Sequence, residues 1–342
     1  MTALTFKPES LTKNFISGLK DRAKDVVVQR YGLGNEVGRK TLESIGQKYG
    51  ITRERVRQIE NFALNSIRQN PSFEAARDNF AEIQEIIDKK GKVVFEREIL
   101  DCLADNPKQK NHVFFLLVLG NEFEKIKEDE EFHHRWTIDK REAEAIHAIL
   151  RNLHNELNES ELVPEQEIIA LLKKRSEDNL KRKISDEILR SWLNISKIIA
   201  SNALGEWGLT DSPRVNPRGM RDFAFLVLRK QGSPMHFTEV SEKISDYFSR
   251  QAHSATVHNE LIKDARFVLV GRGLYALEEW GYKTGAVKDV IKEIIKLKGP
   301  LTKEEIIDIV SKERYVKKNT IVINLQNRDY FTKNRDGKYV FA

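Results

Sequence analysis

The stretch that most restricts how this chain can fold is residues 39–68, RKTLESIGQKYGITRERVRQIENFALNSIR. It predicts two helices joined by a tight turn. Thr41 is placed to cap the first helix, whose apolar face recurs at helical spacing at Leu42, Ile45 and Tyr49. Gly50 stands where a helix ends in the left-handed conformation that glycine adopts at low cost. The first helix is therefore expected to stop at Gly50.

The second helix is expected to begin after Thr52, which is placed to cap it. One face is apolar and comprises Val56, Ile59, Phe62, Ala63 and Ile67, while the opposite face offers Arg53, Glu54, Arg55, Arg57 and Gln58. This is the pattern of a helix-turn-helix, whose second helix enters the major groove of DNA. An arginine can fork onto guanine, a glutamine onto adenine, and a glutamate can accept from cytosine. The alternative is a solvated helix face.

The segment TLESIGQKYGITRERVRQIENFAL resembles region 4 of the sigma-70 family of bacterial transcription initiation factors, and residues 19–34, LKDRAKDVVVQRYGLG, resemble its leading helices. The resemblance implies that the second helix reads an upstream promoter element and that the module docks on a flap of RNA polymerase. By position, Arg53, Glu54 and Gln58 would meet base edges, and Arg55 and Arg57 would meet phosphates. The regions with which the family melts DNA have no room before residue 10, so a complete initiation factor is not expected.

Charge is distributed unevenly over the 342 residues. Residues 1–70 and 283–342 each carry a net charge of +6, whereas residues 71–138 and 139–212 carry −5 and −3. Basic ends can neutralise DNA phosphates, and an acidic centre would be repelled by them. The centre is therefore expected to be a spacer or a protein-contact surface.

Other bulk features favour a cytoplasmic, nucleoid-associated protein. No apolar run approaches the roughly 20 residues of a membrane span, and no signal peptide is evident. The single cysteine, Cys102, lies in an apolar helical pattern and is expected to be a buried structural thiol in a reducing compartment.

The rest of the chain repeats one order of elements: helix, short strand, helix, helix and two-stranded hairpin. This is the order of a winged helix. After an N-terminal module at 1–70, with a loose lead-in at 1–10, the sequence predicts winged helices at 71–139, 140–212, 213–282 and 283–342. The copy at 140–212 is the most divergent. The fold class is therefore expected to be mainly α, with tandem winged helices following a helix-turn-helix.

The third copy is the clearest. Thr238 is placed to cap a helix at 239–248, and a glycine turn at 271–273 joins two short strands as a wing. HFTEVSEKI, TVHNELIKDARFVLVGRGLYAL and EEWGY resemble the HARE-type winged-helix domain over about residues 217–282. That family includes the amino-terminal module of the RNA polymerase delta subunit. The resemblance implies a module that contacts DNA or polymerase.

Both C-terminal copies offer candidate DNA contacts. In the third, the tip of the wing carries Arg272, and the last helix carries His258, Asn259 and Lys263. In the fourth, basic residues gather at the start of the last helix and on the wing, at Lys317, Lys318, Lys333, Arg335 and Lys338. The alternatives are a packed or capping His258 and a solubilising basic surface.

No group of residues predicts catalysis. An acidic turn at 128–131 beside His133 and His134 lacks a second cluster at metal-ligand spacing, so a solvated turn is preferred to a metal site. Paired catalytic carboxylates, a nucleophile with its base and a nucleotide-binding motif are not found, and no cofactor is expected.

These features predict a non-enzymatic bacterial transcription regulator whose partners are double-stranded DNA and RNA polymerase core, without membrane or small-molecule substrate. Two alternatives remain. One is a polymerase-binding protein that never reads sequence. The other is a specificity subunit that partners a DNA-modifying enzyme.

Overall fold

A computed structural model describes residues 4–158, 161–282, 285–313 and 316–342. The first residues of the predicted lead-in and the predicted boundary at residue 283 lie outside this part. The chain divides into two compact units, residues 1–158 with 163–200, and residues 159–162 with 201–342. The protein is mainly helical with small antiparallel sheets, which confirms the predicted fold class.

The first unit begins with the helix-turn-helix module. Its helices are α1 (Pro8–Ser17), α2 (Asp21–Tyr31), α3 (Leu42–Tyr49) and α4 (Arg53–Arg68). The expectation of a loose lead-in over 1–10 was wrong at its end, because Pro8 supplies a preset first-turn φ and starts α1. Both predicted caps are present: the hydroxyl of Thr41 accepts from the Ser44 amide and that of Thr52 from the Arg55 amide.

The next segment has the predicted order of a winged helix. Its elements are α5 (Pro71–Glu74), α6 (Arg77–Lys89), β1 (Val93–Phe95), α7 (Glu96–Leu103), α8 (Pro107–Leu119), β2 (Glu124–Ile126) and β3 (Arg135–Thr137). The strands form an antiparallel sheet in the order β1-β3-β2, with Trp136 opposite both Val94 and Lys125. Cys102 is only partly buried, which corrects the expectation of a buried thiol.

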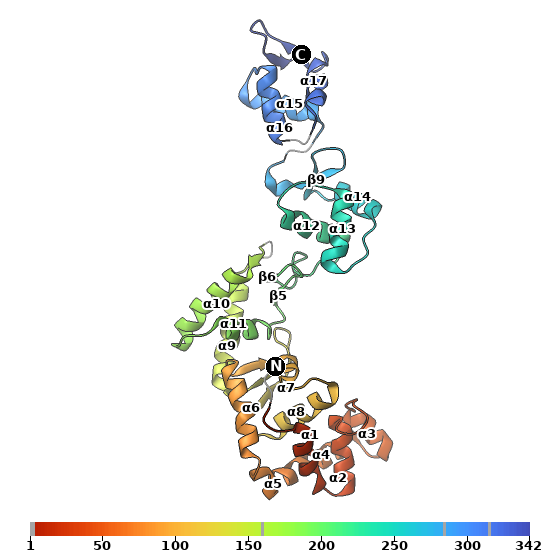
Figure 1. Ribbon diagram of the computed structural model, residues 1–342, viewed down its shortest axis with the longest axis vertical. Helices are drawn as coiled ribbons and strands as arrows, with labels where there is room; N and C mark the ends of the chain where they lie inside the picture. Colours follow the sequence, from red (N-terminus) through yellow and green to blue (C-terminus); the bar gives the residue numbers. More distant parts are fainter. Residues whose placement is uncertain (1–3, 159–160, 283–284, 314–315) are drawn as a thin grey trace. The chain divides into compact units, whose positions relative to one another are not determined.

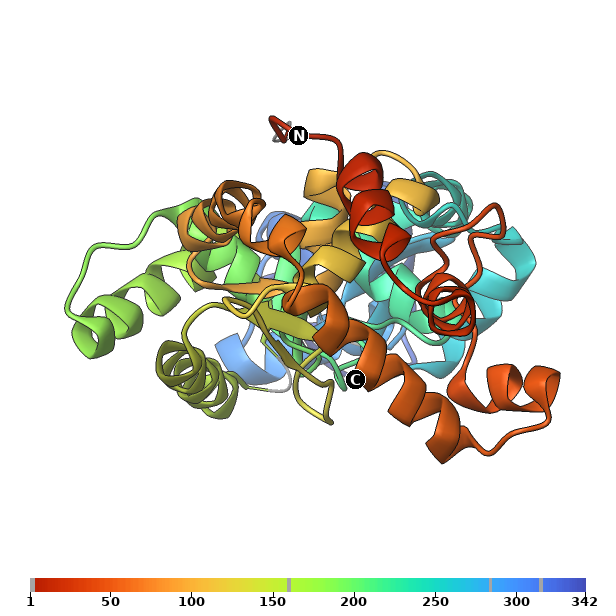
Figure 2. The same cartoon turned by 90° about the horizontal axis from the view of Figure 1, so that it is seen from below.

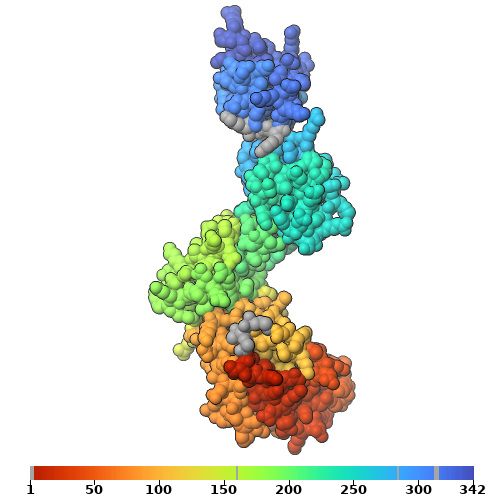
Figure 3. Space-filling view, in the orientation of Figure 1, coloured from red at the N-terminus to blue at the C-terminus, as the bar shows by residue number. Residues whose placement is uncertain are grey.

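The helix-turn-helix module and this first winged helix share one hydrophobic core. Helix α1 lies along α8, and the two segments meet without a gap in the space-filling view (Figures 2 and 3). The ring of Phe15 stacks 6.3 Å from Phe80, and that of Tyr31 lies 4.9 Å from Phe115. The oxygen of Thr12 is 2.5 Å from Nδ1 of His112, and both residues are fully buried. The first 70 residues are therefore packed as part of a larger body.

The second winged-helix segment repeats the order along the chain. Its elements are α9 (Lys140–Glu156), β4 (Val163–Pro164), α10 (Glu165–Leu180), α11 (Asp186–Leu193), β5 (Ile199–Ser201) and β6 (Glu206–Leu209). Within the first unit, the indole of Trp192 donates to the Gly91 carbonyl (3.1 Å), and the wing residue Phe132 bridges to Ser196. The two acidic segments are thus joined by direct contacts.

The second unit holds the last two segments (Figure 1). One comprises α12 (Met220–Gln231), β7 (Met235–His236), α13 (Phe237–Phe248), α14 (Ser254–Lys263), β8 (Phe267–Leu269), β9 (Leu274–Leu277) and the 3-10 helix η1 (Glu278–Trp280). The other comprises α15 (Val287–Lys298), α16 (Lys303–Glu313), α17 (Lys318–Gln326), β10 (Phe331–Lys333) and β11 (Tyr339–Phe341). The β7-β9-β8 sheet and the β10-β11 hairpin form the predicted wings.

The cap of α13 differs from the expectation. His236 caps the helix: its ring Nδ1 accepts from the Thr238 amide (3.4 Å), and its own amide donates to Glu239 (3.4 Å). Thr238 therefore lies inside the first turn.

Across the described residues, none of the helices is both long and apolar enough to cross a lipid bilayer.

Candidate nucleic-acid interface

The turn between α3 and α4 sets the angle at which α4 is presented. Gly50 has φ 61° and ψ 35°, the left-handed conformation expected at a helix end. Gly46 is tighter still, because a Cβ at this position would lie 2.6 Å from the carbonyl oxygen of Ile51. Beneath the turn, Val26, Ile45 and Val56 are fully buried together. This packing holds α4 at a defined angle against α2 and α3.

The first turns of α4 are open to solvent. Thr52, Arg53, Glu54, Arg55, Arg57 and Gln58 are all exposed, as the sequence predicted. The Thr52 hydroxyl accepts the Arg55 amide hydrogen at 3.2 Å, which leaves other first-turn amides pointing outward. A helix start of this kind favours negatively charged groups through its amides and its dipole.

The exposed side chains are partly paired with one another. The guanidinium of Arg57 donates twice to the Glu54 carboxylate, at 2.8 and 2.7 Å, and Arg55 donates to the Gln58 amide oxygen at 2.9 Å. The hydrogen bond from Arg57 lowers the pKa of Glu54 and raises that of Arg57. The Arg53 side chain makes no hydrogen bond or ion pair within the described chain. In this arrangement Arg53 is the immediately available cation, and Glu54 restrains Arg57.

The far side of α4 differs from the sequence interpretation at two positions. Phe62 was placed on the buried stripe, but 62% of it is exposed, because the core beneath α4 is narrower than the stripe. Glu60 was not singled out, yet it is buried and accepts from the Tyr31 hydroxyl at 2.7 Å. Burial, reinforced by the Glu60 charge, raises the pKa of Tyr31. Tyr31 and Glu60 are 29 residues apart in the sequence, so no local pattern predicts this pair.

In the third winged helix, the predicted contacts separate into packed and exposed groups. The His258 ring stacks on Phe237 at 4.3 Å and meets Tyr275 edge-on at 5.8 Å. Asn259 and Lys263 are exposed on the same helix, α14, and Arg272 is exposed in the turn between β8 and β9. The packing alternative for His258 therefore has direct support, while DNA contact by the other three stays a prediction.

In the last winged helix, the basic residues occupy two places. Lys317 and Lys318 are exposed at the start of α17. On the hairpin, Lys333 lies on β10 with its ammonium 5.1 Å from the centre of the Tyr339 ring, Arg335 is exposed in the turn, and Lys338 is partly buried. The amide of Lys338 donates to the Asn334 side chain at 2.9 Å, which shapes the turn. Contact with phosphates stays a prediction for all five.

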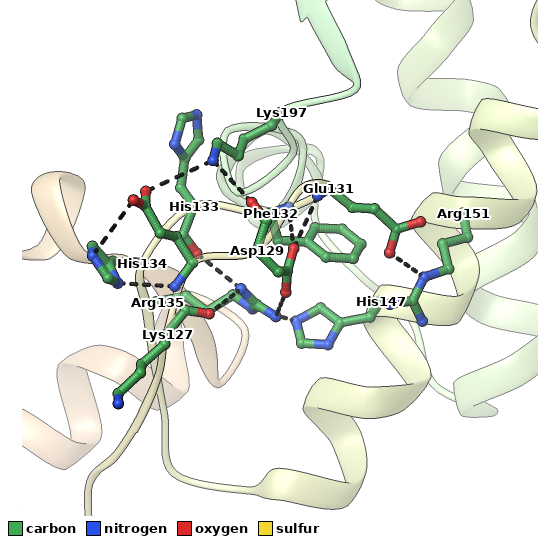
Figure 4. A network of polar contacts seen from close by, with 11 residues as sticks. Lys127, Asp129, Glu131, Phe132, His133, His134, Arg135, His147, Arg151 and Lys197 are labelled. Atoms are coloured by element: carbon green, nitrogen blue, oxygen red, sulfur yellow. Dashed lines mark hydrogen bonds and ion pairs between the residues drawn. The ribbon is translucent and has the colours of Figure 1, made fainter.

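The acidic turn of the first wing belongs to a structural network (Figure 4). The buried Arg135 donates from Nε to Nε2 of His147 at 2.8 Å and pairs through Nη2 with Asp129 at 3.1 Å. His134 accepts the Glu128 amide hydrogen at 2.9 Å. The described part of the chain contains no group of three or more His, Cys, Asp or Glu side chains that could hold a metal ion. Sequence reasoning missed this network, whose only local sign was a charged residue inside the strand RWT.

Comparison with known families agrees with the geometry of two modules. The family described as "Sigma-70, region 4" matches residues 15–69, which hold α2, α3 and α4. The HARE-HTH family, whose description includes the words "restriction endonuclease HTH domain", matches residues 218–280, from α12 to η1. Both resemblances inferred from the sequence are confirmed. The chain is thus a multi-module protein that joins a sigma region 4 helix-turn-helix to a HARE-type winged helix.

Similar curated proteins match the first module. RNA polymerase sigma factor SigA of Microcystis aeruginosa is 51% identical over 57 residues, which is 16% of this chain and 13% of that protein. RNA polymerase sigma factor RpoD of Helicobacter pylori is 37% identical over 71 residues, 21% of this chain and 10% of that protein. RNA polymerase principal sigma factor HrdD of Streptomyces griseus is 37% identical over 79 residues, 22% of this chain and 23% of that protein. The chain thus covers less than a quarter of each of these relatives.

Proposed function

We propose that this protein is a non-enzymatic, cytoplasmic transcription regulator that contacts promoter-like DNA through α4 and associates with RNA polymerase. The observation that carries the proposal is the exposed, Thr52-capped start of α4, with Arg53 unpaired within the described chain, on a module that matches sigma-70 region 4. The relatives named as RNA polymerase sigma factors support polymerase as a partner. The basic side chains of the last two segments would hold flanking phosphates.

The hydrogen bonds among the exposed side chains of α4 indicate which of them could contact DNA directly and which must first leave a partner. Arg53 is available to fork onto a base, whereas Gln58 must leave both Arg55 and Glu54 to present its amide to adenine. Arg57 can reach a phosphate only by leaving Glu54, and Glu54 would then be free to accept from cytosine. Contacts with DNA would thus replace hydrogen bonds and ion pairs within α4, which are weak because they are exposed to water.

The test is selection of bound sequences from a random duplex pool by the full chain. An Arg53→Ala/Gln58→Ala variant should lose an enriched motif that the parent protein retains, and each lost bidentate contact should weaken the motif by about 1–3 kcal/mol. Arg77→Ala is the matched control, because Arg77 is an exposed arginine on α6 paired with Glu74. An equal loss in the control would contradict sequence reading by α4.

A second candidate is a polymerase-binding protein that does not read sequence. The Glu54–Arg57 and Arg55–Gln58 pairs favour it, because they occupy most of the groups that would read bases. The two candidates differ in salt response: each phosphate contact contributes about −0.9 to the slope of log affinity against log salt. Absence of duplex binding at low salt, together with capture of core RNA polymerase, would favour this candidate.

A further inference from the structure

A recess in the first unit lies between the helix-turn-helix module and the first wing. Its volume is about 380 Å³, within the range of about 300–1,000 Å³ typical of small-molecule pockets. One wall comes from the end of α2 and the loop that follows it, and the other from α8 and the wing. The side chains that matter are Arg30, Arg39, Phe114, Lys125, Lys127 and His134. Among the described residues, the lining includes four cations and a histidine but no carboxylate.

Two of the cations have donors to spare. The Arg39 guanidinium lies 3.8 Å from the centre of the Phe114 ring and donates through Nε to the Asn111 side chain at 2.7 Å. Its Nη groups donate no hydrogen bond to any described residue, and Arg39 has no carboxylate partner there. Burial lowers the pKa of Arg39, and the more distant charge of Glu96 opposes this effect without forming an ion pair with Arg39. The ammonium of Lys127 also has no described partner.

The other two cations are already balanced. Lys125 pairs with Glu96 at 2.6 Å, and Arg30 lies 3.4 Å from Glu60. They line the recess, but the donors that remain free for an anion belong to Arg39 and Lys127. His134 adds no free donor, because its Nδ1 accepts from the Glu128 amide and its Nε2 lies 4.0 Å from the Glu128 carboxylate.

Both walls are held in place before any ligand arrives. The Asn111 side chain donates to the carbonyls of Gly32 (3.0 Å) and Val37 (2.8 Å), which fixes the loop that carries Arg39. On the wing, Nη1 of Arg135 donates to the Lys127 carbonyl at 3.2 Å. The Lys127 side chain points away from the polar network around Arg135 (Figure 4). A preorganised anion site needs a fixed backbone that carries cationic groups with free hydrogen-bond donors, and the Arg39 guanidinium and the Lys127 ammonium meet this condition.

We propose that this recess binds a small anion with several phosphate charges, such as a nucleoside or inorganic polyphosphate, held between Arg39 on the loop and Lys127 on the wing. Charges on both walls suit an extended anion better than one phosphate. The Phe114 ring is covered by Arg39 and lies 4.7 Å from the Lys125 ammonium, so recognition rests on the phosphates and not on base stacking. A recess also suits a small ligand better than the convex backbone of a duplex.

The experiment is calorimetric titration of the full chain with inorganic tripolyphosphate at constant ionic strength and without divalent cations. Saturable binding is expected, and Arg39→Gln/Lys127→Gln should weaken it by about tenfold or more, because two charge-assisted contacts are lost. Lys127→Gln alone should weaken it measurably and preserve the fold, since no described contact involves that ammonium. Lys24→Gln is the matched control, because Lys24 is exposed on α2 outside the recess.

Three outcomes would overturn the proposal. One is no saturable binding to the parent protein. Another is an equal loss in Lys24→Gln, which would indicate a general charge effect. The third is a loss of duplex DNA affinity in Lys127→Gln with tripolyphosphate binding unchanged, which would assign the recess to the DNA backbone. Normal duplex binding by a variant that has lost tripolyphosphate binding would support a site separate from α4.

Discussion

At the scale of single residues, the buried Arg135 shows how the first wing tolerates a charge in its core. Only 3% of this arginine is exposed, and it lies on β3 opposite Phe95 and Ile126 of the adjacent strands. Asp129 supplies the counter-charge, the carbonyls of Lys127 and His133 accept from Nη1, and His147 accepts from Nε. This last contact requires an unprotonated ring nitrogen, so the network depends on neutral His147.

The first prediction concerns this histidine. Burial, reinforced by the charge of Arg135, lowers the pKa of His147 from 6.5 to about 4. Between these values the unfolded chain binds more protons at this residue than the folded one, so the contribution of His147 to the free energy of unfolding is steady above pH 6.5 and falls as pH drops toward 4. The loss should reach about 3 kcal/mol at most.

The measurement is chemical unfolding of the full chain between about pH 7 and pH 4, comparing the parent with His147→Gln. Glutamine keeps an acceptor for Arg135 but does not titrate, so the variant should show a shallower decline over this range. Other groups titrate in both proteins and cancel in the comparison. Parallel declines would show that His147 is not the titrating group.

At the scale of elements, the α3–α4 turn separates two roles of glycine. Gly50 needs a positive φ, but a Cβ there would meet nothing within 4 Å. Gly46 has no such φ requirement, but a Cβ there would meet the Ile51 backbone at 2.6 Å. Gly50→Ala should therefore cost about 1 kcal/mol from backbone strain, and Gly46→Ala about 2–3 kcal/mol because the backbone must shift.

Amide hydrogen exchange along α3 and α4 measures this difference directly. Gly46→Ala should speed exchange throughout both helices and weaken duplex binding, since α4 loses its angle. Gly50→Ala should act mainly at the end of α3. A larger effect from Gly50→Ala would mean that the close approach at Gly46 does not hold the turn together.

The same elements show what sequence reasoning can and cannot reach. The caps at Thr41 and Thr52 and the glycine at residue 50 were predictable because each depends on a few neighbouring residues. Phe62 was misplaced because helical periodicity defines a stripe but not how much of it finds a partner. His236 was overlooked because histidine is an uncommon cap.

The charged recess was out of reach for a different reason. Arg39 and its partner Asn111 are 72 residues apart, and Arg39 and Lys127 are brought together only by the packing of the loop and the wing around α8. The shared core also depends on contacts between residues far apart in the sequence, so the modular pattern of the chain did not predict it. Local patterns therefore predicted the modules but not the contacts between them.

At the scale of the whole molecule, that shared core changes what the first module is. Besides the contacts of Phe15 and Tyr31, Arg68 at the end of α4 donates to the carbonyls of Leu119 (3.0 Å) and Val118 (2.8 Å) at the end of α8. These bonds satisfy carbonyls that the helix leaves open. Helix α4 is thus anchored at its C-terminal end by the first winged helix, while the outer face of its N-terminal end remains exposed to solvent.

The last prediction is that the sigma-like module does not fold stably alone. A fragment of residues 1–70 would expose apolar side chains that pack against α6 and α8, and each fully buried one contributes about 1.5–3 kcal/mol. Circular dichroism should show no cooperative thermal transition for 1–70, whereas 1–200, which contains the first unit, should unfold cooperatively. The fragment 1–138 is the control, because it carries the shared core without α9 to α11. A cooperative transition of 1–70 at the temperature of 1–200 would show that the module is autonomous. Failure of 1–70 with success of 1–138 would instead show that the module folds cooperatively only when the first winged helix supports it.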